Sequence, residues 1–480
     1  MHECDGGADA ADSASERCAR CQTLEAQLRE LQRSNDALRE QLAHLFSPAP
    51  EANSSRPPHD DTPTSPADTY SSLTRLELQR YGRQMLVRDF GVASQMKLRD
   101  ARVLIVGVGG LGSPVAMYLG AMGVAHLTLV DGDHVERSNL HRQVIHDESS
   151  LETKKVHSAQ KRLARINPDV ECRALPVRLT TENALELVKQ HDVVVDASDN
   201  VGTRYLVNDA CAIARKPLVS GSALGMEGQV AVFDLDNDAS TSGCYRCLYP
   251  TPQQQPQSCE ENGVVGVVPG IIGCLQAMET IKVLTGMGKP LVGVQCLYDA
   301  YDGQVRRLKL GASRKRDCLA CGAARIGSLR SELLVCSSSI SSDVPKLPST
   351  SRISVQAFAA YRQKHAPTSF VLVDTRPRTQ FDMVHFPEAV HVPFDKVFMK
   401  KTDRKALLAA CGLALPTCRQ KKGDGTNFMQ QKPVFVICRR GVDSVVATQL
   451  LLASGVSNVQ NVDGGYTEYA RSVDPIFPMY

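Results

Sequence analysis

The sequence has almost no net charge. Its 55 lysines and arginines against 52 aspartates and glutamates leave a formal charge of +3 over 480 residues. A surface that binds nucleic acid needs a strong positive excess, so nucleic acid is not expected as a direct partner. The sequence also lacks a G-x-x-x-x-G-K-[ST] motif, which argues against a P-loop NTPase.

Signals for a membrane or for secretion are missing as well. No run of about 18 apolar residues is present, so neither a membrane span nor a membrane partner is expected. The first residues, MHECDGGADAADSASE, are acidic and polar, unlike a secretory or mitochondrial leader. The 16 cysteines therefore indicate thiol chemistry and metal binding rather than a disulfide framework. A reducing, cytosolic environment is expected.

Length and composition predict a globular chain with more than one unit. At 480 residues the chain exceeds one ordinary core, and 42% hydrophobic with 22% charged residues is typical of soluble folds. Two stretches in which strand-like and helical runs alternate predict α/β domains, the first with a mainly parallel, doubly wound Rossmann-like sheet. The predicted segments are a tail with a coiled-coil helix at 1–46, a linker at 47–70, a first domain at 71–322, a linker at 323–350 and a smaller domain at 351–480.

A heptad pattern marks the predicted N-terminal helix. Its seam residues recur with alternating steps of four and three, as in a coiled coil. They are Leu24, Leu28, Leu31, Asn35, Leu38, Leu42 and Leu45. Because the pattern lasts barely three heptads, a helix packed on its own domain explains it as well as a dimerising coiled coil does.

A glycine-rich loop follows the first strand-like run of the larger domain. Residues 102–112 read RVLIVGVGGLG, and a helix-like run follows. Glycines there let the backbone approach a phosphate, and the helix amino terminus adds free N–H groups. The next strand ends at Asp131, which is placed to accept hydrogen bonds from ribose hydroxyls. An NAD-binding domain explains these features as well as an ATP site does.

Polar residues after this loop favour ATP. Asn139, Arg142 and Gln143 follow the strand, and Lys155 stands in the next predicted helix. A cationic clamp of this kind suits a triphosphate and is not needed for a nicotinamide dinucleotide.

A later strand, HDVVVD, supplies carboxylates. Asp196, Asp199 and Asn200 follow one another at its carboxyl end, where ligands of α/β sheets are bound. A carboxylate in that place can hold Mg²⁺, which neutralises phosphate charge during transfer.

These motifs resemble the adenylating domain of ubiquitin-activating, MoeB and ThiF-type enzymes. RYGRQ, GVGGLG, VDGDHVERSNLHRQ, TKK and DASDN occur in the order of that family over about residues 75–322. The resemblance implies that Arg83 reaches the nucleotide of a partner subunit, and hence a homodimer. It further implies contacts with ATP or its magnesium by Gly110, Asp131, Ser138, Asn139, Leu140, His141, Arg142, Lys155, Asp199 and Asn200.

The resemblance also implies the reaction. The substrate would be the terminal glycine carboxylate of a ubiquitin-like protein, which is already ionised at pH 7 and needs no general base. It would attack the α-phosphate of ATP and release pyrophosphate. Positioning and charge neutralisation by arginine, lysine and Mg²⁺ would supply the catalysis.

Two C-x-x-C pairs predict a metal site. Cys244 with Cys247 and Cys318 with Cys321 form the ligand set of a closed structural zinc site, although two unrelated turns would give the same pattern. The adenylating family carries such pairs in these places, which implies one Zn²⁺ per subunit.

Other cysteines give weaker signals. Cys18 and Cys21 form a single pair near the start of the chain and are a poor metal candidate. Cys259 follows the loop sequence TPQQQPQS, and the family keeps a cysteine in such a loop as a thioester or resolving thiol. The surrounding Cys-Glu-Glu-Asn-Gly departs from the usual Cys-Ala-Asp-Gly-Gly, so an unreactive loop thiol is the alternative.

Cys438 ends an apolar run in the smaller domain. Residues 434–444 read VFVICRRGVDS. If the loop wraps around the sulfur, its N–H groups and two arginines are expected to lower the thiol pKa and to stabilise an anion. Ser444 stands where a C-x₅-R phosphatase would have its arginine, which disfavours phosphate-ester cleavage.

The surroundings of Cys438 resemble a rhodanese over about residues 351–480. FVLVDTRPRTQFDMVHFPEAVHVPF matches the opening of that fold, and NVDGGYTEYA matches its closing turn and helix. The segment Phe386-Pro387-Glu388, Val442 and an inserted CRQKKGDGTNFMQQ depart from the usual pattern and affect fine specificity. The resemblance implies that Cys438 carries a persulfide.

An adenylating domain followed by a rhodanese resembles the eukaryotic adenylyltransferase and sulfurtransferase family that activates molybdopterin synthase and the ubiquitin-related modifier. The resemblance implies ubiquitin-like sulfur carriers ending in Gly-Gly as partners, with a cysteine desulfurase or another sulfur donor. The product would be a carrier thiocarboxylate for tRNA wobble-uridine 2-thiolation and molybdenum cofactor biosynthesis. Two rival interpretations are an NAD-dependent dehydrogenase fused to a rhodanese and a non-catalytic adaptor for ubiquitin-like proteins.

Overall fold

The computed structural model describes two compact units, Met1–Cys336 and Ser337–Tyr480. The described residues are Glu30, Arg33, 72–233, 243–250, 263–310, 314–323, 327–329, 347–399, 404–413 and 432–479. Glu30 and Arg33 are helical, but the seam of the heptad lies outside the described residues, so the coiled coil stays a prediction. Cys18, Cys21 and Cys259 also lie outside them.

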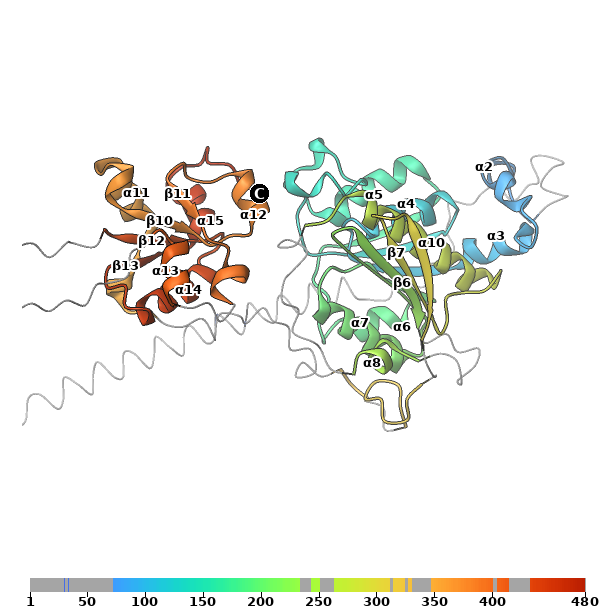
Figure 1. The fold of residues 1–480 in the computed structure, drawn as a ribbon. Coiled ribbons are helices and arrows are strands. Elements are labelled where there is room, and N and C mark those ends of the chain that lie inside the picture. The colour runs from blue at the N-terminus through green and yellow to red at the C-terminus, as the bar shows by residue number, and fades with distance from the viewer. Residues whose placement is uncertain are drawn as a thin grey trace, which may run out of the picture. The chain divides into compact units, whose positions relative to one another are not determined.

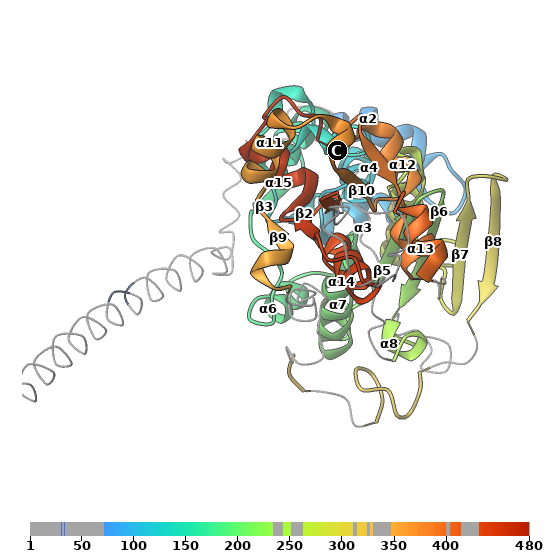
Figure 2. The ribbon, with the colours of Figure 1, turned by 60° about the vertical axis from the view of Figure 1, so that its left-hand side comes forward.

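An eight-stranded sheet forms the first unit (Figure 1). Its spatial order is β3-β2-β1-β4-β5-β6-β7-β8. Strands β1 to β5 pair in parallel, and β5 to β8 pair antiparallel, with β8 outermost beside β7 (Figure 2). The strands are β1 (Arg102–Val106), β2 (His126–Val130), β3 (Glu171–Leu175), β4 (Val193–Asp196), β5 (Leu218–Leu224), β6 (Glu227–Phe233), β7 (Val294–Asp299) and β8 (Gln304–Lys309).

Helices cover both faces of this sheet. One apolar core includes Leu98, Val115, Ala159 and Ile272 of α3, α4, α5 and α10, and a second core on the other face includes residues of α6 and α7. The bounds are α2 (Arg75–Met85), α3 (Gly91–Asp100), α4 (Gly112–Ala121), α5 (Lys155–Ile166), α6 (Ala184–Lys189), α7 (Val201–Ala214), α8 (Tyr245–Leu248) and α10 (Val267–Thr285), with single turns η2 (Arg137–Asn139) and η3 (Glu148–Ser150). The predicted doubly wound α/β fold is confirmed.

The strand order fixes where a ligand binds. The chain proceeds from β1 to β2 and β3 on one side and then crosses to β4 and β5 on the other, so the connection reverses between β1 and β4. At such a switch point the loops at the carboxyl ends of the two strands diverge and leave a crevice. Strands β1 and β4 are buried on both faces, as expected of continuous apolar runs in a parallel sheet.

Helix α10 is long and apolar enough to cross a membrane, and it is the one helix of this kind among the described residues. The sequence shows no such run at first sight because Gln276, Glu279 and Lys282 interrupt it. Half of its apolar window is buried, and Ile272, Ala277 and Ile281 lie in the core with α4 and β1. This helix therefore packs as a core helix of the sheet.

The second unit is a parallel five-stranded sheet of order β11-β10-β12-β13-β9. Apolar cores on its two faces are covered by α13 and α14 on one side and by α11 and α15 on the other. The strands are β9 (Arg352–Ile353), β10 (Val371–Asp374), β11 (Ala389–His391), β12 (Val434–Ile437) and β13 (Val459–Val462). The helices are α11 (Val355–Lys364), α12 (Arg378–Met383), α13 (Arg404–Ala410), α14 (Asp443–Ala453) and α15 (Gly465–Ser472), with the single turns η6 (Ser349–Ser351), η7 (Pro367–Ser369) and η8 (Phe394–Phe398).

Candidate active sites

The glycine loop joins β1 to α4 and presents backbone donors. Gly107 has a φ of 91°, and a Cβ there would lie 2.8 Å from the Ala197 carbonyl oxygen, so the turn requires glycine. The N–H groups of Gly109 and Gly110 donate to no atom in the described part of the chain. They lie at the amino terminus of α4, whose dipole favours an anion there.

Asp131 follows β2 and shapes this loop. Its Oδ2 accepts from the N–H of Val108 at 2.8 Å, and its Oδ1 accepts from the N–H of Asp133 at 2.9 Å. Each carboxylate oxygen has a second lone pair, so the predicted contact with a ribose hydroxyl remains compatible with this geometry.

Residues 138–142 lie in η2 and in the turn that follows it, and the polar residues among them form one hydrogen-bond network. Arg142 donates to Asn139 Oδ1 at 2.9 Å and to the Ser138 carbonyl oxygen at 3.1 Å, and Gln143 Nε2 donates to the same Asn139 oxygen at 3.2 Å. The Asn139 amide NH₂ is thereby turned away from them, toward Glu136 Oε2 at 3.5 Å. Burial and then the adjacent guanidinium lower the pKa of His141. Leu140 is half-buried.

Lys155 is the first residue of α5, as the sequence predicts. Its side chain is 9% exposed, and Nζ lies 3.3 Å from Asp133 Oδ2. Arg178 contacts the other oxygen of Asp133 at 3.6 Å. The sequence gives a role to Asp131, the first acid of VDGD, and none to Asp133, the second acid. The contact with Lys155 makes Asp133 a neighbour of the candidate site.

The three polar residues at the carboxyl end of β4 have different environments. Asp196 is fully buried and accepts hydrogen bonds from Ser198 Oγ at 2.6 Å and Arg204 Nε at 3.2 Å. Asn200 caps α7, since its Oδ1 accepts from the N–H of Thr203 at 2.8 Å. Of the three, Asp199 is the carboxylate that is exposed, and it remains the candidate for Mg²⁺.

A cleft of about 480 Å³ begins at this point and runs over β5 to β8. Leu111, Ser198 and Asp199 line one end, next to the glycine loop. Tyr205, Tyr245 and Tyr249 line its side, and Asp299 and Arg306 line the part over the outer strands.

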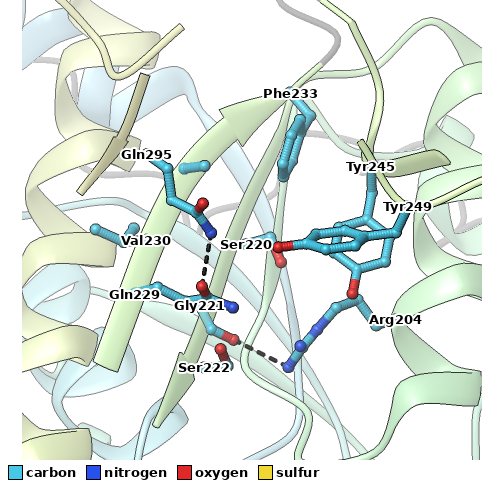
Figure 3. A pocket seen from close by; sticks show the side chains of 11 residues that line it. Arg204, Ser220, Gly221, Ser222, Gln229, Val230, Phe233, Tyr245, Tyr249 and Gln295 are labelled. Atoms are coloured by element: carbon cyan, nitrogen blue, oxygen red, sulfur yellow. Dashed lines mark hydrogen bonds between the residues drawn. The ribbon is translucent and has the colours of Figure 1, made fainter. Parts of the chain in front are cut away.

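Arg204 forms the floor beside this aromatic wall. Figure 3 shows a smaller pocket that shares Arg204, Tyr245 and Tyr249 with the cleft. There Arg204 lies beneath the two tyrosines and donates to the Gly221 carbonyl oxygen at 3.3 Å. No sequence motif marks Arg204 as a residue of the cleft. The structure identifies it by its buried ion pair with Asp196.

The four predicted metal ligands come together. Their Sγ atoms all lie within 4.8 Å of one another, and all four cysteines are buried. Three of the Sγ–Sγ distances are 3.4 Å (Cys247–Cys321), 3.6 Å (Cys244–Cys318) and 4.0 Å (Cys244–Cys247). A tetrahedron with Zn–S bonds of about 2.3 Å has edges of about 3.8 Å, so the cluster fits a Zn²⁺ ion.

Arg83 lies elsewhere on the first unit. It is exposed in the last turn of α2, on the outside of the chain. That position is compatible with a contact to a second subunit.

Cys438 follows β12, and the next residues wrap around its sulfur. The Gly441 N–H donates to Sγ at 3.1 Å, and Ser444 Oγ donates to it at 3.3 Å from the first turn of α14. The predicted lowering of the thiol pKa is nevertheless wrong. Burial raises the pKa of Cys438 and the Asp443 carboxylate raises it further, and together they outweigh the hydrogen bonds from Ser444 and Gly441 that lower it.

Comparison with known proteins matches both units. Residues 81–320 match the ThiF family, and residues 355–472 match the rhodanese-like domain. The adenylyltransferase and sulfurtransferase MOCS3 of Mus musculus is 38% identical over 469 residues, which cover 95% of this chain and 98% of that protein. The MOCS3 proteins of Xenopus laevis and Sus scrofa are 39% and 40% identical over 85% and 87% of this chain, and 90% and 91% of theirs. The chain belongs to the MOCS3 family.

Membership of the MOCS3 family decides between the interpretations of the sequence. The chain is an adenylyltransferase and sulfurtransferase, with the first activity in the ThiF-type unit and the second in the rhodanese-like unit. The NAD-dependent dehydrogenase and the non-catalytic adaptor are therefore set aside.

The environment of Cys438 in the rhodanese-like unit can be tested by a substitution. Replacing Asp443 with Asn removes a negative charge that disfavours the thiolate, so the pKa of Cys438 should fall. The acid limb of the pH profile for sulfur transfer from thiosulfate to cyanide should move to lower pH. In the control Asp382→Asn, which alters an exposed ion pair with Arg378 in the same unit, the profile should not move. An unmoved acid limb in Asp443→Asn would contradict this account.

Proposed function

We propose that this enzyme uses ATP and Mg²⁺ to adenylate the terminal glycine of a ubiquitin-like sulfur carrier and then converts it to a thiocarboxylate with sulfur from Cys438. The observation that carries the proposal is the junction of two binding features. Leu111 and Asp199 line one end of the cleft. Leu111 follows Gly109 and Gly110, whose N–H groups donate to no described atom and could bind an anion. An extended chain in the cleft would bring its terminal carboxylate to a phosphate on that loop.

In the first half-reaction the carrier carboxylate attacks the α-phosphorus, the new P–O bond makes a mixed carboxylic–phosphoric anhydride (the acyl adenylate), and pyrophosphate leaves. The loop N–H groups of Gly109 and Gly110, with Arg142 and Lys155, bind the phosphate oxygens and neutralise the developing charge. Asn139 offers its amide NH₂ because Arg142 and Gln143 occupy its oxygen. Mg²⁺ at Asp199 would supply further charge neutralisation when bound.

In the second half-reaction the Cys438 thiolate first takes a sulfur atom from a donor persulfide, and the donor thiolate leaves. The terminal sulfur of the new persulfide attacks the acyl carbon, and AMP leaves with the electron pair of the C–O bond. A second thiolate then attacks Cys438 Sγ, which breaks the S–S bond and releases the thiocarboxylate. The Cys438 disulfide formed in that step is reduced by thiols. Cys259 is the proposed second thiol.

The remaining proposals concern ligands and partners. Cys244, Cys247, Cys318 and Cys321 would hold one structural Zn²⁺, because four buried thiols at tetrahedral spacing match its preferred ligands. The enzyme would work in the cytosol as a homodimer, with Arg83 reaching the partner subunit's nucleotide. The proposed carriers are the ubiquitin-related modifier and the small subunit of molybdopterin synthase. A cysteine desulfurase would load Cys438, and the products would serve tRNA thiolation and molybdenum cofactor biosynthesis.

Exchange of labelled pyrophosphate into ATP tests the first half-reaction. The purified enzyme should catalyse the exchange only when a carrier ending in Gly-Gly is present, and a carrier truncated by its last two residues should give none. Adding a persulfide donor should add one sulfur atom in place of oxygen, a mass gain of about 16 Da in the intact carrier. Carrier-independent exchange, or no exchange at all, would overturn the proposal.

A further inference from the structure

We infer that Arg246 is a positioning residue that fixes the aromatic wall of the cleft by joining the four-cysteine cluster to α7. The inference rests on the proposed function, in which the cleft receives the carrier's terminal segment. Arg246 lies between Cys244 and Cys247 in the sequence, so its backbone is fixed by the first cysteine pair.

Arg246 makes a buried, two-pronged contact with α7. Its Nε and Nη2 donate to the two carboxylate oxygens of Asp209, each at 2.7 Å, and the side chain is 2% exposed. Beside it, Asn208 Oδ1 accepts from the N–H of Tyr245 at 2.7 Å. Asn208 and Asp209 of α7 thus bind Tyr245 and Arg246, the two residues between Cys244 and Cys247. Paired hydrogen bonds of a guanidinium with a carboxylate fix angle as well as distance.

The residues held in this way form the wall. The Tyr245 ring lies 5.1 Å from the Tyr205 ring, edge to face at 79°, and 4.9 Å from the Tyr249 ring. The Arg246 guanidinium lies 4.5 Å from the centre of the Tyr205 ring. Tyr205 Oη also donates to the Tyr249 carbonyl oxygen at 3.0 Å. Tyr245 immediately follows one cysteine of the cluster, and Tyr249 is two residues past another, so displacement of the cysteine pair would displace the wall.

Helix α7 connects this wall with the nucleotide end of the cleft. Tyr205, Asn208 and Asp209 all belong to it, and its capping residue, Asn200, adjoins Asp199. A buried ion pair contributes little net free energy to folding, because the cost of desolvating both charges offsets most of their electrostatic attraction. The pair Arg246–Asp209 is better explained by the geometry that it imposes on the wall than by a contribution to folding.

Steady-state exchange kinetics of Arg246→Met test this role. With the ubiquitin-related modifier as carrier, the half-saturating carrier concentration should rise about tenfold, the size expected for losing well-placed aromatic contacts. The half-saturating ATP concentration should change less than about twofold, since the loop, Arg142 and Lys155 are untouched. Zinc content should stay near that of the wild type, whereas the melting temperature should fall, because Asp209 is left buried without its partner. Arg246→Lys keeps the charge but not the two-pronged contact and should show the same defect in milder form.

Two further variants separate positioning from general damage. Tyr249→Ala removes part of the wall directly, and the defect of the double variant Arg246→Met/Tyr249→Ala should be smaller than the sum of the two single defects. In the control Arg362→Met, which breaks a less buried ion pair with Glu388 in the second unit, both half-saturating concentrations should match the wild type.

Four results would overturn the inference. They are an unchanged carrier requirement in Arg246→Met, an equal rise for carrier and ATP, loss of zinc from Arg246→Lys, and additive defects in the double variant. If Arg246→Met does not fold, Arg246→Lys and its double variant with Tyr249→Ala decide the matter. Carrier-dependent exchange of the wild type is measured before any variant. Its absence would overturn the proposed function rather than this inference.

Discussion

Replacing Cys438 with alanine is expected to abolish thiocarboxylate formation while leaving carrier-dependent ATP–pyrophosphate exchange within about twofold of the wild type. The sulfur of Cys438 is the only atom of that side chain that can hold a persulfide, and it ends β12 in the second unit. The residues proposed for adenylation all belong to the first unit. Intact-carrier mass spectrometry and pyrophosphate exchange, run on one sample, measure the two half-reactions separately.

A second cysteine of the same unit provides the matched control. Cys411 is fully buried in the apolar core beside α13, and burial raises the pKa of its thiol to about 12, which disfavours the thiolate. Cys411→Ala should keep both half-reactions. Loss of exchange in Cys438→Ala would show that the two units do not divide the chemistry, and retained thiocarboxylate would show that another thiol carries the sulfur.

The parallel parts of both sheets could be predicted because their strands are short apolar runs that end in polar residues. Val103–Val106, the run before Asp131 and Val434–Ile437 all became strands at the expected places. Burial on both faces leaves such runs no amphipathic period, and the polar residue after each run marks the carboxyl edge where sites form. Helix α14 begins at Asp443, directly after the loop that carries Cys438.

The antiparallel half of the first sheet could not be predicted in the same way. Strand β8 is exposed along its whole length, so no apolar run marks it. Its pairing with β7 depends on backbone register, which composition does not reveal. The cleft lies over these strands, and its aromatic wall comes from α7 and the first cysteine pair. The sequence thus predicted the nucleotide loop and the cysteine cluster, and it did not reveal that the cluster adjoins the cleft.

The Cys438 loop shows a second limit of sequence reasoning. The residues around the sulfur were predicted correctly, and two of the expected donors, the N–H of Gly441 and Ser444 Oγ, do reach it. The sign of the pKa shift depends on burial, which the residue types do not disclose. Asp443 acts against the thiolate, and Arg440 faces Asp443, lowering the pKa of that carboxyl, which burial raises.

Replacing Lys155 with alanine is expected to lower carrier-dependent exchange about 100- to 1,000-fold, the usual loss when one preorganised donor to a developing charge is removed. Sulfur transfer from thiosulfate to cyanide should be unaffected, because that activity belongs to the second unit. The fold should survive, since Asp133, which would lose its partner, is 54% exposed and keeps its contact with Arg178. Exchange and cyanide assays on the same preparation check both statements.

Lys161→Ala is the matched control for the loss of one positive charge from α5. Lys161 lies on the same helix but is exposed, and Lys161→Ala removes an equal charge without touching the nucleotide site, so exchange should stay near the wild-type rate. Lys155→Arg keeps the charge, but its wider planar head does not fit the place of an ammonium that is 9% exposed, so it should restore little activity. If Lys155→Ala exchanged pyrophosphate normally, the phosphates would have to lie away from α5. If it lost both activities, the defect would be one of folding. Loss of exchange with intact sulfur transfer, opposite to the Cys438→Ala result, would assign each half-reaction to its own unit.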